Sequence, residues 1–190
     1  MNFIKVVILL FFMFKGSMII SQEYDPWILE IGINIVDNSG SRFEELLDIE
    51  DNWNLSKLVR ASIEKRFDYD FGAVLALSLN EFSRGKKINS VINNGRADYF
   101  AIDVMMKNYT SNYWHDARHA KYDAYLIGGW GGNFFNSDIN NTINLGFGLN
   151  IKIKTYTWIS FQTLGKFSID NNTPGNANHL QHSVSVVFWL

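Results

Sequence analysis

Residues 142–152 read Thr-Ile-Asn-Leu-Gly-Phe-Gly-Leu-Asn-Ile-Lys. From Ile143 to Ile151 every second residue is large and apolar, whereas the residues between them are asparagine or glycine. Successive side chains of a β-strand point to opposite faces, so a period of two predicts a strand with one apolar and one small or polar face. The stretch is about twice as long as the average strand of a soluble protein, which has roughly five or six residues.

The same alternation recurs in seven further segments, each about ten residues long, which is the strand pattern rather than the helical one. In chain order, the eight predicted strands are residues 27–37, 54–64, 71–81, 97–107, 122–131, 142–152, 156–167 and 181–190. We therefore predict an all-β fold, an eight-stranded antiparallel up-and-down β-barrel.

The predicted connections alternate in length. Those after the first, third, fifth and seventh strands are long and polar, and they cover residues 38–53, 82–96, 132–141 and 168–180. Residues 65–70 and 153–155 form short connections after the second and sixth strands, whereas the connection 108–121 is longer than this rhythm predicts. Long loops at one rim and tight turns at the other are typical of outer-membrane barrels.

Alternation alone does not distinguish a membrane barrel from a soluble antiparallel sheet, so a lipocalin-like cup is the alternative fold. Strand length favours the membrane, because a tilted strand needs roughly 9–11 residues to cross the hydrocarbon layer. A membrane also forces closure, since each unpaired backbone group in hydrocarbon costs several kcal/mol. We therefore predict a transmembrane barrel in which the last strand pairs with the first and the apolar faces point outward.

The polar faces carry charged residues that we predict to point into the lumen. They are Glu30, Arg60, Glu64, Asp103, Asp123 and Lys166. An eight-stranded barrel is just wide enough for side chains to fill its interior, so we expect these residues to pair with one another in a polar plug. A solute channel is the alternative.

Tryptophan and tyrosine residues gather near the ends of the predicted strands. We predict that they form girdles at the two membrane–water interfaces, with ordinary core aromatics of a soluble barrel as the alternative. The residues concerned are Trp27, Trp53, Tyr69, Tyr99, Tyr109, Tyr113, Trp114, Trp130, Tyr156 and Trp158.

Residues 1–21 predict a cleaved signal peptide. A lysine at position 5 precedes an apolar run from Val6 to Phe14, and a junction of Ser21, Gln22 and Glu23 follows. This layout is that of a secretory leader, and the apolar run is far shorter than the roughly 20 residues that a membrane-spanning helix needs. Residues 22–190 are then the mature barrel domain.

Composition excludes several classes of function. The chain has 17 basic and 19 acidic residues, and removal of the leader would take away two lysines and no acid. The mature protein would therefore carry a net negative charge, which gives no indication of nucleic-acid binding. The chain contains no cysteine, which excludes disulfides, thiolate metal sites and cysteine nucleophiles.

Four stretches together resemble the eight-stranded barrel of proteins similar to outer-membrane protein A. These are residues 43–54, 77–80, 122–130 and 179–190. The resemblance implies a location in the bacterial outer membrane, with outer-membrane lipid, the barrel-assembly machinery and other outer-membrane proteins as partners. It also implies that Phe188, Trp189 and Leu190 form the C-terminal signal for barrel assembly. It covers the barrel domain alone, without a peptidoglycan-binding domain, so no peptidoglycan tether is implied.

The sequence contains two histidine arrangements that could carry chemistry, and neither predicts an active site. His115 and His119 are four residues apart, but a third metal ligand is not apparent, so we expect a solvated turn and no metal. His182 and Ser183 are adjacent on a predicted strand and therefore point to opposite faces, which separates a nucleophile from its base. No Gly-x-Ser-x-Gly motif is present. We expect no catalytic residue and no cofactor.

The sequence therefore predicts a small structural outer-membrane barrel that contributes to envelope integrity or serves as a subunit of a larger complex. Two other functions are the alternatives. One is a soluble exported lipocalin-like binding protein, and the other is a lipid-modifying barrel enzyme.

Overall fold

Eight long strands make up the protein in a computed structural model, which describes residues 26–37, 53–85, 87–88, 91–92, 94–116, 119–135, 138–170 and 178–190. The predicted signal peptide lies outside the described residues. The long strands are β1 (Trp27–Asp37), β3 (Ser56–Arg66), β4 (Phe71–Phe82), β7 (Ala97–Asn108), β8 (Tyr122–Phe135), β9 (Asp138–Lys154), β10 (Thr157–Ser168) and β11 (His179–Trp189). Three two-residue strands, β2 (Trp53–Asn54), β5 (Lys87–Ile88) and β6 (Val91–Ile92), and a 3₁₀ turn, η1 (Thr110–Tyr113), complete the fold.

The long strands form one closed antiparallel barrel. Their order is β11-β10-β9-β8-β7-β4-β3-β1, and β11 also pairs with β1. This seam runs from Ile28, paired with Trp189, to Asp37, paired with Leu180. The backbone amide of Leu190 extends it by donating to the carbonyl of Trp27 at 2.9 Å. The predicted eight-stranded up-and-down barrel, closed between the last strand and the first, is therefore confirmed.

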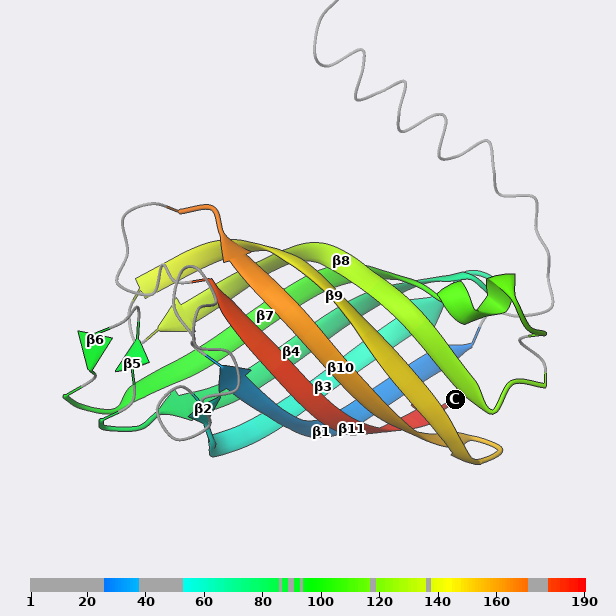
Figure 1. The fold of residues 1–190 in the computed structure, drawn as a ribbon, viewed down its shortest axis with the longest axis horizontal. Helices are drawn as coiled ribbons and strands as arrows, with labels where there is room; N and C mark the ends of the chain where they lie inside the picture. The colour runs from blue at the N-terminus through cyan, green and yellow to red at the C-terminus, as the bar shows by residue number, and fades with distance from the viewer. Residues whose placement is uncertain are drawn as a thin grey trace, which may run out of the picture.

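The two ends of the barrel differ, as Figure 1 shows. We call the end that holds the start of β1 and the end of β11 the turn end, and the opposite end, which carries β2, β5 and β6, the loop end. At the turn end, tight turns join β3 to β4 and β9 to β10. The long connection between β7 and β8 also lies there and contains η1.

One predicted connection is wrong. Residues 132–141 were expected to form a long polar loop, but β8 continues to Phe135 and β9 begins at Asp138. The register pairs Gly132 with Asn141 and Phe134 with Ile139, so both strands extend well beyond their predicted ends. The cross-strand ladder overrides the low strand preference of the glycines and asparagines here, since backbone pairing needs no particular side chain.

Most described residues belong to strands. No helix among them is long and apolar enough to cross a membrane.

Candidate functional site: the lumen and the outer wall

The alternation of each strand sorts side chains between the lumen and the outer wall. On β9, Phe147 is 63% exposed and Leu145 is 58% exposed, whereas Asn144 between two such positions is fully buried. The same holds on β4, where Leu75, Leu77 and Leu79 are exposed and the residues between them are buried. The wall is therefore apolar on the outside and polar on the inside, which is the reverse of a soluble barrel.

The exposed apolar side chains of the outer wall form a belt. This apolar belt ends sharply toward the loop end. Val59, Leu79, Phe100 and Phe134 form one cross-strand row over four strands. One outward position further toward the loop end, Glu81 pairs with Asp98, and Lys57 reaches both carboxylates at 2.7 and 2.6 Å. Charge thus replaces hydrocarbon within a single row, as expected where lipid gives way to headgroups and water.

The residue that makes this boundary possible is Lys57. Its φ of 53° makes it the one non-glycine residue with positive φ among those described. The pairing of β3 with β4 is irregular between Ser56 and Val59, around this residue. The irregularity lets Lys57 reach Glu81 and Asp98 on the outside of the wall, at the cost of a strained backbone.

Several of the aromatic residues predicted to form girdles are exposed at the turn end. Trp27, Tyr113, Trp114 and Tyr156 are exposed there, and Lys65 lies over the Trp27 ring at 5.0 Å. The prediction is wrong for three others, because Tyr99, Tyr109 and Trp158 are buried and lie inside the barrel wall. Their positions in the alternation place them on the lumen side, which the girdle pattern did not take into account.

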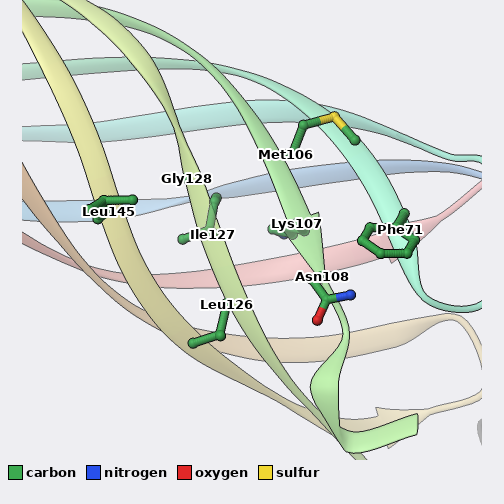
Figure 2. Close-up of a pocket in the computed structure, with 8 residues that line it drawn as sticks. All are labelled: Phe71, Met106, Lys107, Asn108, Leu126, Ile127, Gly128 and Leu145. Carbon is green, nitrogen blue, oxygen red and sulfur yellow. The ribbon is translucent and has the colours of Figure 1, made fainter. Parts of the chain in front are cut away.

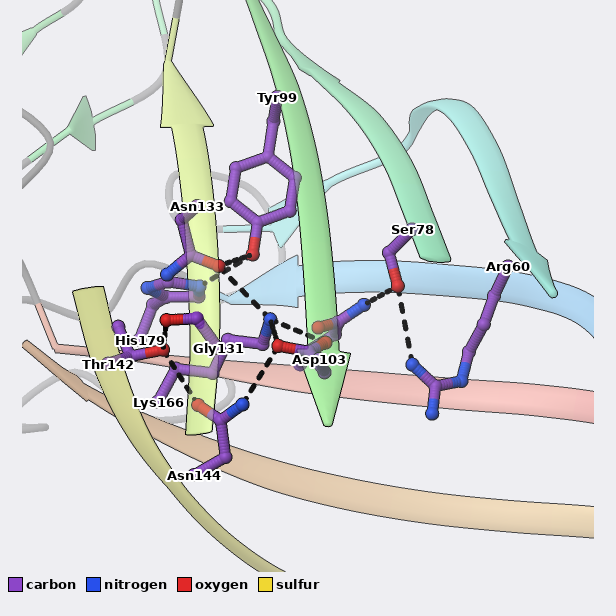
Figure 3. Close-up of polar contacts among 11 residues, drawn as sticks. Arg60, Ser78, Tyr99, Asp103, Gly131, Asn133, Thr142, Asn144, Lys166 and His179 are labelled. Carbon is purple, nitrogen blue, oxygen red and sulfur yellow. Dashed lines mark hydrogen bonds and ion pairs between the residues drawn. The ribbon is translucent and has the colours of Figure 1, made fainter. Parts of the chain in front are cut away.

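A polar network fills the loop-end half of the lumen, shown in Figure 3. Lys166 on β10 donates to both oxygens of Asp103 on β7 at 2.7 and 2.8 Å, and to Asn133 Oδ1 at 3.1 Å. Asn144 Nδ2 donates to the same Asp103 carboxylate at 2.8 Å. The Tyr99 hydroxyl donates to Asn133 Oδ1 at 3.0 Å and lies 3.1 Å from His179 Nε2. The charge of Asp103 is therefore matched and hydrogen-bonded on several sides.

A second network fills the turn-end half. Glu64 accepts from Lys107 at 2.9 Å and from the Tyr109 hydroxyl at 2.6 Å. The Arg66 guanidinium lies 3.6 Å from the Tyr109 ring centroid, and its Nη1 is 3.6 Å from Asp123 Oδ2. The Tyr109 phenol thus stacks against the Arg66 cation and is hydrogen-bonded to the Glu64 carboxylate. Together with the contacts to Lys107 and Asp123, this network connects β3, β7 and β8.

Arg60 and Glu30 lie between these two networks. Arg60 Nε is 3.7 Å from Glu30 Oε1, and Arg60 Nη1 donates to Ser78 Oγ at 3.3 Å. The same Ser78 hydroxyl accepts from Gln181 at 2.8 Å, so one serine links β3, β4 and β11 across the lumen.

All six charged residues predicted to point inward are buried and lie in the lumen. They do not pair only with one another, because Glu64 and Asp123 contact Lys107 and Arg66 instead. The sequence predicts Lys107 only as the last residue of the strand 97–107, and it predicts Arg66 in the connection 65–70. Both follow the inward alternation of β7 and β3, which is the signal that could have found them. With them, the described lumen carries four acidic and four basic side chains.

The connection between β7 and β8 packs back onto the turn end. Ser111 is buried, and its Oγ accepts from the backbone amide of Ala124 at 3.1 Å. Asn112 contacts the β3–β4 turn through the Tyr69 carbonyl and Asp70. The β7–β8 connection, which is longer than expected, therefore packs against the neighbouring β3–β4 turn and holds the two together.

The outer wall is indented at Gly128, where a shallow groove of about 280 Å³ opens among apolar side chains. Figure 2 shows Phe71, Met106, Leu126 and Leu145 around it. Apart from Lys107 and Asn108, its lining is the same hydrocarbon as the rest of the belt.

Of the two histidine arrangements, one lies in the β7–β8 connection and the other on β11. His119 Nδ1 lies 3.0 Å from Asp116 Oδ2 in an exposed turn, whereas the His115 ring packs edge-on against Tyr122 at 4.8 Å. Ser183 is buried on the lumen side while His182 lies on the outer wall, where its Nδ1 is 3.0 Å from the Thr163 hydroxyl. No group of three or more histidine or acidic side chains suited to a metal occurs within the described ranges.

Comparison with known proteins identifies the fold and nothing finer. No protein-family model and no curated protein matches the chain. Among solved structures, it is similar to Ail, the attachment invasion locus protein of Yersinia pestis, in complex with the heparin analogue sucrose octasulfate, at 11% identity and a TM-score of 0.51 over 87% of this chain and 99% of that one. It is also similar to neisserial surface protein A, at 10% identity and a TM-score of 0.54 over 86% of this chain and 96% of that one.

A third similar structure is the outer membrane protein Ail of Yersinia pestis in a phospholipid bilayer nanodisc, at 11% identity and a TM-score of 0.51 over 88% of this chain and 100% of that one. At such identities the likeness establishes a shared architecture, the closed eight-stranded barrel of small outer-membrane proteins. A specific membership in the family of outer-membrane protein A does not follow from it.

Proposed function

We propose that this chain is a structural protein of the bacterial outer membrane, in which residues 22–190 span the bilayer after removal of residues 1–21. The observation that carries the proposal is the position of the apolar belt. Hydrocarbon side chains face outward on all eight long strands, and the belt ends abruptly at Lys57, Glu81 and Asp98. A protein with such a surface would aggregate in water, whereas the surface is suited to contact with lipid acyl chains.

The lumen supports a structural role rather than transport. Arg60, Arg66, Tyr99, Tyr109 and Tyr125 are among its largest buried side chains. Ion pairs and hydrogen bonds between opposite strands would have to break before a solute could pass. A lipocalin-like cup would need an apolar interior, whereas this one carries eight charged side chains. We therefore propose a rigid, closed cylinder that contributes to envelope integrity or anchors a larger complex, without enzymatic activity.

The exposure of the C-terminal residues supports the proposal that the barrel-assembly machinery recognises this end of the chain. Phe188 and Leu190 are exposed at the end of β11, while Trp189 packs against Trp158 at 5.8 Å between ring centroids. An exposed apolar strand end is accessible to a recognition partner before the seam with β1 closes. Outer-membrane lipid and other outer-membrane proteins are the partners of the finished belt.

Cell fractionation tests the membrane assignment. The mature protein should pellet with the outer membrane and should migrate faster on a denaturing gel before boiling than after it, because a closed barrel resists detergent until heated. Recovery in the soluble periplasmic fraction would overturn the proposal.

Planar-bilayer recording tests the closed lumen. The purified protein should insert without steady ion conductance above the background of the bilayer. Stable single-channel steps would contradict the structural role and favour a pore.

A further inference from the structure

A second groove of the outer wall lies where the apolar belt ends, and its volume is about 540 Å³. Its lining contains the apolar row of Val59, Leu79, Phe100 and Phe134, with Lys57 and Asp98 at its loop-end edge. Sites for small ligands have volumes of roughly 300–1,000 Å³. Because one part of the lining is hydrocarbon and the other is charged, the groove suits a ligand that has both an apolar and a charged part.

The charged edge of the groove carries both signs. Lys57 contacts the carboxylates of Glu81 and Asp98, and the Asp98 side chain is 72% exposed. Arg96 lies two residues before Asp98, so it has the same outward direction. Its side chain is 81% exposed, and its Nε is 3.9 Å from Glu81 Oε1, which is beyond the roughly 3.2 Å limit of a good hydrogen bond. Two cations and two carboxylates therefore balance, while the Arg96 guanidinium and the Asp98 carboxylate are open to a ligand.

Gly132 forms a depression in the wall next to the groove. It occupies the outward position of β8 adjacent to that of Phe134, and it pairs with Ile102 on β7. A side chain at this position would lie between the rings of Phe134 and Trp130, whose nearest atoms are 3.8 and 3.9 Å from its Cβ. Because glycine has no side chain, an acyl chain can lie here in contact with both rings, on the belt side of the charged edge.

We infer that this groove binds one molecule of an ethanolamine phospholipid. The lipid phosphate accepts hydrogen bonds from the Arg96 guanidinium, whose planar fork matches phosphate oxygens. The primary ammonium donates to the Asp98 carboxylate, and an acyl chain lies along Phe100, Phe134 and Gly132. This lipid site rests on the membrane placement proposed above, and it selects a headgroup, which an apolar belt alone does not.

Charge complementarity favours this headgroup over two others. A phosphate and an ammonium place opposite charges on one headgroup, as Arg96 and Asp98 do on the edge of the groove. Phosphatidylglycerol carries the phosphate without a cation, so the carboxylates of Asp98 and Glu81 would repel it. Phosphatidylcholine has the same net charge as the ethanolamine lipid, but its quaternary ammonium has no N–H to donate to Asp98.

Native mass spectrometry of the mature barrel in detergent micelles, titrated with each of these three phospholipids, tests the site. Wild type should bind one phosphatidylethanolamine molecule about tenfold more tightly than either of the other lipids, a ratio that corresponds to one charge-assisted hydrogen bond. Arg96→Gln should weaken the binding of phosphatidylethanolamine by about tenfold for the same reason. Lys65→Gln is the matched control, since it removes an outward cation at the turn end, and it should leave the affinity unchanged.

Two further variants separate the headgroup from the acyl chain. Asp98→Asn should bind phosphatidylethanolamine and phosphatidylcholine equally, because it removes the charge that pairs with the primary ammonium. Gly132→Leu should weaken the binding of both lipids and keep the preference for ethanolamine, because leucine fills the depression between Phe134 and Trp130. Faster migration before boiling than after it shows that each variant is folded.

Equal affinities of wild type for the three lipids, a preference for phosphatidylglycerol, or an Arg96→Gln variant that binds as tightly as wild type would overturn the inference. These outcomes differ from a failure of the membrane assignment. A barrel that selects no headgroup still pellets with the outer membrane, whereas a protein recovered in the soluble periplasmic fraction removes both proposals.

Discussion

Lys166 Nζ lies 2.7 and 2.8 Å from the two carboxylate oxygens of Asp103, across the lumen and 63 residues apart in the chain, with both side chains fully buried. The pair joins β7 to β10, which are not neighbours in the sheet. Contacts of this kind across the lumen fix the cross-section of the barrel, because its wall is a single layer of strands that could otherwise deform.

Removing one partner of this pair should destabilise the barrel strongly. Lys166→Met leaves the Asp103 carboxylate buried without its cation, and we expect a loss of about 3–5 kcal/mol in the free energy of unfolding. Urea unfolding in lipid vesicles, followed by tryptophan fluorescence, measures it. The double variant Lys166→Met with Asp103→Leu should recover much of the loss, and a neutral Lys166→Met would show that the pair does not stabilise the fold.

Gly148 should not tolerate a methyl group. A Cβ at this inward position of β9 would collide with the phenol ring of Tyr125, whose hydroxyl donates to Gln162 at 3.2 Å. Gly148→Ala should therefore cost about 1–3 kcal/mol by overpacking. Gly132→Ala is the matched control, since no atom lies closer than 3.8 Å to its Cβ. Equal unfolding free energies for the two variants would contradict the packed lumen.

A charge in the middle of the outer wall should oppose insertion into a bilayer. Leu77 lies midway along β4 and is exposed, so Leu77→Arg should cost about 2–4 kcal/mol in vesicles. Tyr156→Arg, at the turn end, should cost no more than about 1 kcal/mol because it lies near the interface. If Leu77→Arg folds as well as wild type into vesicles, the belt does not face lipid.

The strained backbone at Lys57 should be visible in a pair of substitutions. Lys57→Ala and Lys57→Gly both remove the contacts with Glu81 and Asp98, but only glycine adopts a φ of 53° freely. We expect Lys57→Gly to be the more stable of the two by about 1 kcal/mol. Thermal unfolding in micelles compares them, and an alanine variant as stable as the glycine variant would show that the backbone there relaxes.

Strand positions could be predicted well where both faces keep their character. The expected strand 27–37 coincides with β1, and the others differ from the structure by a few residues at their ends. The exception is the pair β8 and β9, where Gly132, Asn133, Asn140 and Asn141 resemble a loop in composition. Their strand conformation is imposed by the partner across the ladder, which a single sequence does not reveal.

The partners of the lumen charges could not be predicted. Sequence alternation places Glu64 and Asp123 inward, but their contacts with Lys107 and Arg66 depend on how far each strand is shifted against its neighbour. The same holds on the outer wall, where the sequence shows only that His182 is adjacent to Ser183. Its spatial neighbours are instead Thr163, Asp37 and Trp53, which come from three other strands.

The number of strands and the residues of each face follow from the alternation of residue types, because side-chain direction along a strand reverses at every residue whatever lies beside it. Which groups meet across the lumen, such as Gln181 and Ser78, 103 residues apart, depends on the folded barrel. Closure of the sheet and the stagger of its strands set those distances, and both are properties of all eight strands together.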